Sequence, residues 1–241
     1  MTQRALQTPE ARSIDGQQLT DVKSARAGDP IDDGPPTLVW SDPMGVRTER
    51  CEECGHQVPA YDAVHLTVSA KQSRRICTRC FNALMAKRVG VEFEHPDFTP
   101  LVLEDAAGTP HEFHFRTRHG GDHVAVEAFE ITDQRAGGWE FQVLGDPSDD
   151  PITIFQRLFE RMRRALGRTH IEETAHGPQI ARSAEGWVVR GQIAWDDEEN
   201  GRVPRLVIDG KGYSWDELGH MVMNFEGFRL KMEVYDKSED R

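Results

Sequence analysis

The feature that most constrains this chain is a set of four cysteines arranged as two Cys-x-x-Cys pairs. Cys51 and Cys54 form the first pair, Cys77 and Cys80 form the second, and twenty-two residues separate the pairs. Within each pair, the two intervening residues let the backbone curl so that both sulfurs face one point. Zn²⁺ binds four such thiolates tetrahedrally at about 2.3 Å. The spacing therefore predicts one structural zinc ion held by all four cysteines.

The residues around the cysteines indicate how such a module folds. Gly55 follows the first pair and tolerates the left-handed backbone that a metal-binding turn often needs. The twenty-two residues between the pairs contain the run 64–68 and are long enough for a hairpin, and residues 81–88 are helix formers followed by a stop at Gly90. This order of a knuckle, a hairpin and a helix opened by the second pair resembles the treble-clef class of zinc fingers. Treble clefs bind nucleic acid, dock proteins or scaffold enzymes, so the resemblance does not select a function.

Two other uses of the cysteines are less well supported. A redox pair of the thioredoxin type sits in a βαβ pattern, which is absent from the sequence. A catalytic zinc keeps one coordination position open for water or substrate, whereas four cysteines fill the shell. His56 could replace one cysteine, but with four available we interpret it as a neighbour of the site. The zinc is therefore expected to be structural.

Charge argues against a general nucleic-acid binder, although not in every part of the chain. The formal net charge is -12, which disfavours binding to a polyanion. From Cys51 to Gly90, however, six basic residues stand against three acidic ones. These candidate contact residues are Lys71, Arg74, Arg75, Arg79, Lys87 and Arg88. They either offset the charge of a zinc–thiolate centre or contact an acidic protein or nucleic acid, for which the arginines of 157–168 are further candidates. Both interpretations stay open.

The sequence outside the cysteine segment predicts an α+β fold. Residues 111–118, 124–131 and 139–144 alternate apolar and polar side chains and predict an antiparallel meander. Asp150 before Pro151 predicts the start of a helix that runs to Gly167. The face of this helix that we expect to be buried consists of Phe155, Leu158, Phe159, Met162 and Leu166.

The last third of the chain predicts a further α+β unit. Strands are expected over 187–195 and 205–208, with a tight turn at Asp209-Gly210. Ser214 and Glu217 match a capping box, which predicts a helix from about Trp215 that ends before Gly227. A final strand is expected over 228–235. Its shared apolar face would consist of Phe228, Leu230, Met232 and Val234.

These expectations divide the chain into four parts. Residues 1–36 hold few large apolar side chains and are predicted to be a disordered arm. A treble-clef zinc module follows at 37–95, with a short docked strand expected at 37–40. An antiparallel sheet with an amphipathic helix covers 96–170, and an α+β region covers 171–241. These two regions look similar to uncharacterised bacterial domain families, and whether they form one domain or two is left open.

Two further clusters are candidate sites. His111, His114, His119 and His123 surround one predicted hairpin, but strand alternation separates their faces, so we expect surface histidines. The acidic run 196–199 lacks the spaced ligands of a calcium loop and is expected to be solvated. No nucleophile elbow, phosphate loop or paired metalloprotease histidines occur in the sequence. An enzyme with an unrecognised site in the α+β region stays an alternative.

The sequence as a whole favours a non-enzymatic protein that acts through a partner. We expect a zinc-binding adaptor or regulator that binds another protein, with a nucleic-acid-binding regulator as the main alternative. No apolar run approaches the roughly 20 residues that span a bilayer, and the N-terminus lacks the basic-then-apolar pattern of a secretion signal. A cytoplasmic location, without membrane contact, is therefore expected. The excess of arginine over lysine is typical of a GC-rich bacterial source.

Overall fold

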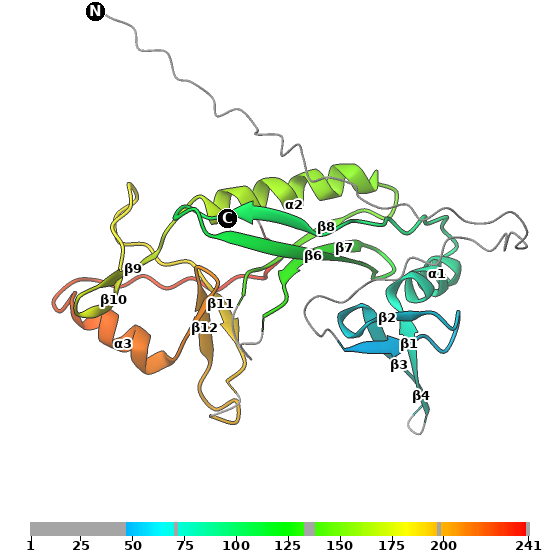
Figure 1. Ribbon diagram of the computed structural model, residues 1–241, viewed down its shortest axis with the longest axis horizontal. Coiled ribbons are helices and arrows are strands. Elements are labelled where there is room, and N and C mark those ends of the chain that lie inside the picture. The colour runs from blue at the N-terminus through cyan, green and yellow to red at the C-terminus, as the bar shows by residue number, and fades with distance from the viewer. Residues whose placement is uncertain (1–46, 70–71, 133–137, 197–198, 240–241) are drawn as a thin grey trace, which may run out of the picture. The chain divides into compact units, whose positions relative to one another are not determined.

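The computed structural model describes residues 47–69, 72–132, 138–196 and 199–239 and has an α+β fold (Figure 1). Its described part contains three α-helices and several small antiparallel sheets, which confirms the predicted fold class. The predicted arm at 1–36, the strand at 37–40 and the side chain of Lys71 lie outside the described residues.

The cysteine segment folds in the predicted order of knuckle, hairpin and helix. Strands β1 (Thr48–Arg50) and β2 (Gln57–Pro59) pair antiparallel around the first cysteine turn. After a short 3-10 turn, η1 (Ala60–Asp62), strands β3 (Ala63–Ser69) and β4 (Gln72–Cys77) form the hairpin. Helix α1 (Thr78–Val89) follows at once and ends at Gly90, whose φ of 76° is left-handed. Glycine adopts this conformation without steric cost.

A four-stranded antiparallel sheet forms the next layer, in the order β5-β6-β7-β8. Its strands are β5 (Leu101–Glu104), β6 (Pro110–His119), β7 (Val124–Glu130) and β8 (Glu140–Gly145). The three-stranded meander expected from the sequence corresponds to β6, β7 and β8 and is confirmed. Strand β5 was not predicted, because its four residues are too short a run to show a period.

Helix α2 (Pro151–Leu166) packs on one face of this sheet (Figure 1). The Asp150 side chain accepts a hydrogen bond from the Ile152 N–H, which confirms the predicted cap. The residues of α2 that are fully buried against the sheet are Ile154, Leu158, Met162 and Leu166. Phe155 and Phe159, which were predicted to be buried, are only half-buried, and Phe155 stacks on Phe98 at a centroid distance of 4.6 Å. The buried stripe is therefore centred on Ile154 and Leu158.

The C-terminal region contains two small sheets and a helix. Strands β9 (Ile171–Thr174) and β10 (Gly177–Ile180) form a hairpin that was not predicted. Strands β11 (Gln192–Ala194), β12 (Arg205–Ile208) and β13 (Lys211–Tyr213) form a second sheet, with the predicted turn at Asp209-Gly210. Helix α3 (Trp215–Met223) starts at Ser214 with the complete capping box. Both local signals are thus confirmed.

Two strand predictions in this region are wrong. Of the strand expected over 187–195, only the three residues of β11 form a strand and pair with β12. The final strand expected over 228–235 does not form. Its residues are extended but belong to no strand, and its four apolar side chains are between 63% and 75% exposed.

None of the described helices combines the length and the apolar character that crossing a membrane requires.

Candidate metal centre

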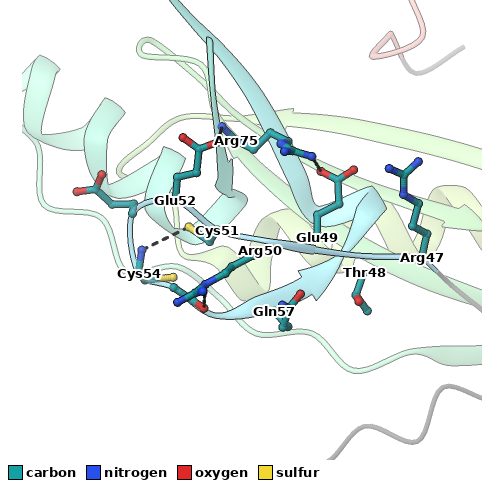
Figure 2. A pocket seen from close by; sticks show the side chains of 11 residues that line it. Arg47, Thr48, Glu49, Arg50, Cys51, Glu52, Cys54, Gln57 and Arg75 are labelled. Carbon is teal, nitrogen blue, oxygen red and sulfur yellow. Dashed lines mark hydrogen bonds and ion pairs between the residues drawn. The ribbon is translucent and has the colours of Figure 1, made fainter. Parts of the chain in front are cut away.

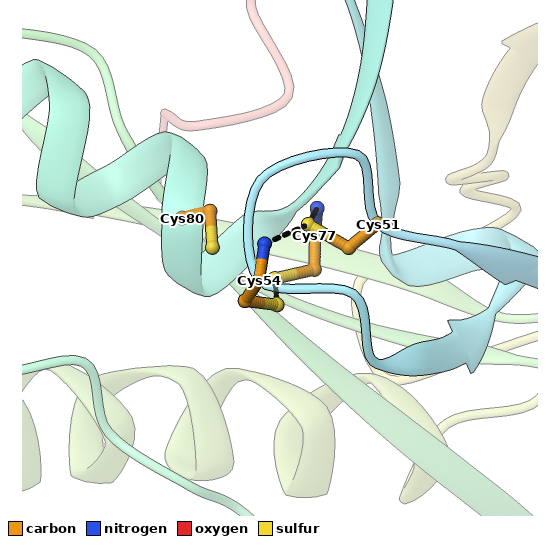
Figure 3. Close-up of side chains that lie close together, drawn as sticks. All are labelled: Cys51, Cys54, Cys77 and Cys80. Carbon is orange, nitrogen blue, oxygen red and sulfur yellow. Dashed lines mark hydrogen bonds between the residues drawn. The ribbon is translucent and has the colours of Figure 1, made fainter.

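The structure brings the four predicted cysteines together (Figure 3). Cys51 and Cys54 lie in the turn between β1 and β2, while Cys77 and Cys80 lie at the junction of β4 and α1. All four sulfurs lie within 4.8 Å of one another, and the Sγ atoms of Cys54 and Cys77 are 3.9 Å apart. A tetrahedron with Zn–S bonds of about 2.3 Å has sulfurs about 3.8 Å apart. The cluster therefore has the size that a single four-coordinate zinc ion requires.

Backbone amides point at the sulfurs as they do in a thiolate site. The N–H groups of Cys54 and Cys77 donate to the Cys51 Sγ at 3.5 Å and 3.3 Å. Cys77 is also the N-cap of α1, so Cys80 sits in the first helical turn. The partial positive charge at a helix N-terminus stabilises a nearby thiolate. The turn and the start of the helix thus supply two backbone donors to the Cys51 sulfur.

Burial and hydrogen bonding act in opposite directions on these thiols. Burial alone would raise the pKa of the Cys51 thiol, but backbone N–H donors from Cys54, Cys77 and Glu53 lower that pKa to about 6. Burial raises the pKa of Cys77, and burial likewise raises the pKa of Cys80. The Cys51 thiol therefore loses its proton most readily, whereas the thiols of Cys77 and Cys80 resist deprotonation. A divalent cation would remove that resistance by neutralising the sulfurs.

The apolar core around the cysteines is small. Its buried members are Cys51, Cys77 and Ile76. Half-buried side chains complete it, namely Val58, Val64, Leu66, Cys80 and Phe81. A unit of this size buries too little apolar surface to be stable by itself, and such units usually need a metal or disulfides. Two of its three buried residues are cysteines of the candidate metal site. This composition fits a module in which a bound metal ion would form part of the core.

The predicted basic residues of the module are largely paired with carboxylates. Arg74 and Glu53 lie 2.5 Å apart, and Arg79 and Asp97 lie 2.5 Å apart. Arg75 lies 3.9 Å from Glu49. Lys87 and Arg88 are exposed in the last turn of α1. The positive electrostatic potential expected from the basic residues of the module is therefore reduced by the carboxylates that lie next to three of its arginines.

A hollow of about 720 Å³ lies beside the cysteine turn (Figure 2). Its lining residues are Arg47, Thr48, Glu49, Arg50, Cys51, Glu52, Glu53, Cys54, Gly55, Gln57 and Arg75. Three guanidinium groups and three carboxylates thus line the hollow. Because charges of both signs alternate there, the hollow lacks the single-sign field that attracts a phosphate backbone.

Sequence reasoning missed one residue that holds the module to the sheet. Asn82 of α1 is fully buried, and its Nδ2 donates to the Thr117 carbonyl at 2.8 Å. Its Oδ1 accepts from the His119 N–H at 2.8 Å. An asparagine inside a helix is ordinarily placed on the solvent face because of its polarity. The sequence gives no sign that both of its polar atoms find backbone partners on β6.

The histidine cluster is not a surface cluster, contrary to the sequence-based expectation for His119. His119 is fully buried, and its Nδ1 accepts from the Gly121 N–H at 3.0 Å. Burial lowers its pKa, so the ring is neutral. His111 instead lies between Glu130 and Asp105, at 2.6 Å and 3.3 Å. Within the described residues, only the four cysteines place three or more His, Cys, Asp or Glu ligand atoms within 4.8 Å of one another.

The acidic run that was expected to be solvated begins with a buried residue. Asp196 is only 5% exposed, and its Oδ2 lies 3.7 Å from the Arg205 guanidinium on β12. This ion pair explains why a carboxylate can be buried there. Residues 197–198 lie outside the described residues.

Three family models match consecutive parts of the chain, and each describes a domain of unknown function. DUF7685 matches residues 50–92, DUF7686 matches residues 94–167 and DUF7713 matches residues 170–239. The similarity to uncharacterised domain families is therefore established over 50–239. No curated protein and no solved structure matches the chain. The descriptions of these three families name neither a ligand nor an activity.

Proposed function

We propose that this protein is an intracellular, zinc-stabilised adaptor or regulator that acts by binding another protein. The observation that carries the proposal is the convergence of four cysteine sulfurs, from two separate turns, within 4.8 Å. Four thiolates would fill the coordination shell of one zinc ion and leave no position for substrate. When bound, the ion would supply folding free energy to the module. The residues that would hold it are Cys51, Cys54, Cys77 and Cys80.

The surface of the finger helix supports a protein partner over a nucleic acid. Leu84 and Val89 on α1 and Val91 just after it are 45%, 44% and 39% exposed. Lys87 and Arg88 stand beside them in the last turn. Apolar side chains rimmed by cations suit an amphipathic, acidic protein surface. A phosphate backbone would instead need many unpaired cations, and three of the module's arginines already face carboxylates.

The metal assignment is tested by elemental analysis of reduced protein. We expect one zinc per chain in the wild type and a loss of zinc in Cys77→Ser, because the buried sulfur of Cys77 has no substitute. His56→Ala is the matched control, since His56 is exposed next to the cysteine turn. It should keep its zinc. Wild-type protein without a stoichiometric metal ion would end the proposal.

The partner class is tested by affinity capture with surface variants. Leu84→Asp with Val89→Asp should abolish recovery of the bound protein without loss of zinc. Ile152→Asp on α2, where Ile152 is 62% exposed, introduces the same change on another surface and should leave recovery intact. A gel-shift titration at low ionic strength addresses the alternative. A complex with nucleic acid that weakens steeply with salt would favour the nucleic-acid-binding regulator instead.

A further inference from the structure

The segment 228–235 is an extended chain with an exposed apolar face. It follows α3 and is drawn as coil near the red end of the colour bar (Figure 1). Phe228, Leu230, Met232 and Val234 are 65%, 75%, 63% and 71% exposed. Isolated exposed apolar residues are common, but four at every second position form a continuous stripe. Such a stripe along an extended backbone is the pattern of a strand that lacks its partner.

Both ends of the segment are held in place. At its start, the Phe228 ring packs edge-on against Trp187 and Phe225, with centroids 5.9 Å and 5.8 Å apart. Just after its end, Lys237 lies 3.1 Å from Glu140, and the Glu239 carbonyl accepts from Arg161 at 2.9 Å. The chain between these anchors is thus held extended before any partner binds. This lowers the entropy that a pairing strand must lose.

The charged side chains lie on the opposite face from the apolar stripe. Lys231 and Glu233 are two residues apart, and their charged atoms lie 2.7 Å apart, which shows that both are on the same side. Arg229 has the same parity. The segment therefore has one apolar and one charged face. Along the chain, the charged face carries Arg229, Lys231 and Glu233.

We infer that segment 228–235 pairs antiparallel with the same segment of a second copy of this chain. A two-fold axis at Met232 places Lys231 opposite the second copy's Glu233, and the reverse, so two ion pairs form. Leu230 then lies opposite Val234, and Met232 lies opposite its own copy. Cross-strand pairs of opposite charge and of apolar residues stabilise antiparallel strands.

The charges also disfavour the neighbouring registers. Two side chains that face each other across the pair must lie on the same face of the sheet. The register can therefore change only in ways that keep the apolar side chains opposite apolar side chains. Moving the axis to Lys231 places two lysines opposite each other, and moving it to Glu233 does the same with two glutamates. Like charges directly opposite are destabilising. An in-register parallel pair would place Lys231 opposite Lys231 and Glu233 opposite Glu233. Only the axis at Met232 places both Lys231 and Glu233 opposite a residue of the other sign, while Arg229 faces Tyr235. This self-complementarity identifies a second copy as the occupant.

Charge reversal tests both the dimer and its register. In zinc-loaded, reduced protein, sedimentation velocity should show a concentration-dependent dimer. Lys231→Glu and Glu233→Lys should each weaken dimerisation about tenfold or more, because each turns both cross-strand pairs repulsive. Mixing the two variants should restore the dimer, since each then supplies the charge that the other lacks. Arg202→Glu, which makes the same charge change at an exposed loop residue, should dimerise like the wild type.

Three outcomes would overturn the inference. A wild type that stays monomeric throughout the concentration series would do so, and so would a dimer that both charge variants retain. A dimer that each variant loses but the mixture does not recover would reject the register. Leu230→Asp provides a separate check, because a charge in the apolar stripe should also give monomers. Zinc content and circular dichroism of each variant separate loss of pairing from loss of fold, and neither result depends on the proposed adaptor role.

Discussion

At the scale of single residues, Asn82 makes the most consequential contact that the sequence conceals. It has no exposed surface, and it satisfies the Thr117 carbonyl and the His119 N–H at once. Removing the side chain leaves both backbone groups buried without a partner, at a cost of about 1–3 kcal/mol for each. We expect Asn82→Ala to lower the free energy of unfolding by about 2–6 kcal/mol in urea denaturation.

The control for this prediction is Asn224→Ala, the same substitution at an exposed residue after α3. It should change stability by no more than about 0.5 kcal/mol. Equal effects of the two substitutions would show that the hydrogen bonds of Asn82 do not stabilise the fold.

Asp62 gives a prediction about pH. Burial raises the pKa of its carboxyl to about 6, against the opposing charge of Arg116 and a hydrogen bond from Thr78. Since this pKa lies above the value of 3.8 for an exposed aspartate, the folded state binds the proton more tightly than the unfolded state. The resulting stabilisation is complete below the unfolded pKa and is lost as pH rises through about 6.

The variant Asp62→Asn, which stays neutral, isolates this effect. The difference in Tm between variant and wild type, measured with saturating zinc, should shift in favour of the variant as pH rises from about 5 to about 8. Taking the difference cancels the pH dependence of the cysteines, which both proteins share. A difference that does not vary with pH would mean that Asp62 titrates as an exposed carboxyl.

At the scale of elements, local chemistry was predicted well and tertiary pairing was not. The Asp150 cap, the Ser214 capping box and the Asp209-Gly210 turn all depend on residues a few positions apart, which a sequence displays directly. The same holds for the cysteine pairs. The alternation at 228–235 predicted a strand that does not form, because a strand also needs a neighbouring strand. In the described part of one chain, none pairs with it.

Burial that depends on distant partners was also hidden. His119 and Asp196 are polar and were expected at the surface, yet their partners come from α1 and from β12. Strand β5 and the β9–β10 hairpin are too short to show a period by themselves. Such features follow from long-range packing, which local pattern does not encode.

Helix α2 provides a matched pair of substitutions on one element. Leu158 has no exposed surface and lies in the centre of the core against the sheet. Leu158→Ala should lower the free energy of unfolding by about 2–5 kcal/mol, because it leaves a cavity in close-packed surroundings. Ile152→Ala, at a side chain that is 62% exposed, should cost about 0.5 kcal/mol or less. Similar values in chemical denaturation would show that α2 is not seated on the sheet as described.

At the scale of the whole molecule, the cysteine module and the sheet are connected through a few identified contacts. Asn82 joins α1 to β6, and the Tyr61 carbonyl accepts from Arg116 on the same strand at 2.8 Å. Structural zinc contributes about 10–16 kcal/mol of apparent free energy in small finger peptides, which is comparable to the total stability of a typical domain. Loss of zinc should therefore unfold the cysteine module completely and loosen β6 only where it receives these contacts.

Hydrogen exchange before and after removal of zinc by a strong chelator tests this coupling. Amides of 47–90 should lose protection, and the His119 amide, which donates to Asn82, should lose part of its protection. Amides of β12 and β13, whose core is formed by Ile208, Tyr213 and Met221, should keep theirs. Because β12 and β13 belong to a separate core cluster, loss of protection there would mean that the chain unfolds as one cooperative unit. Unchanged protection across 47–90 would mean that the four sulfurs stabilise their module without an ion.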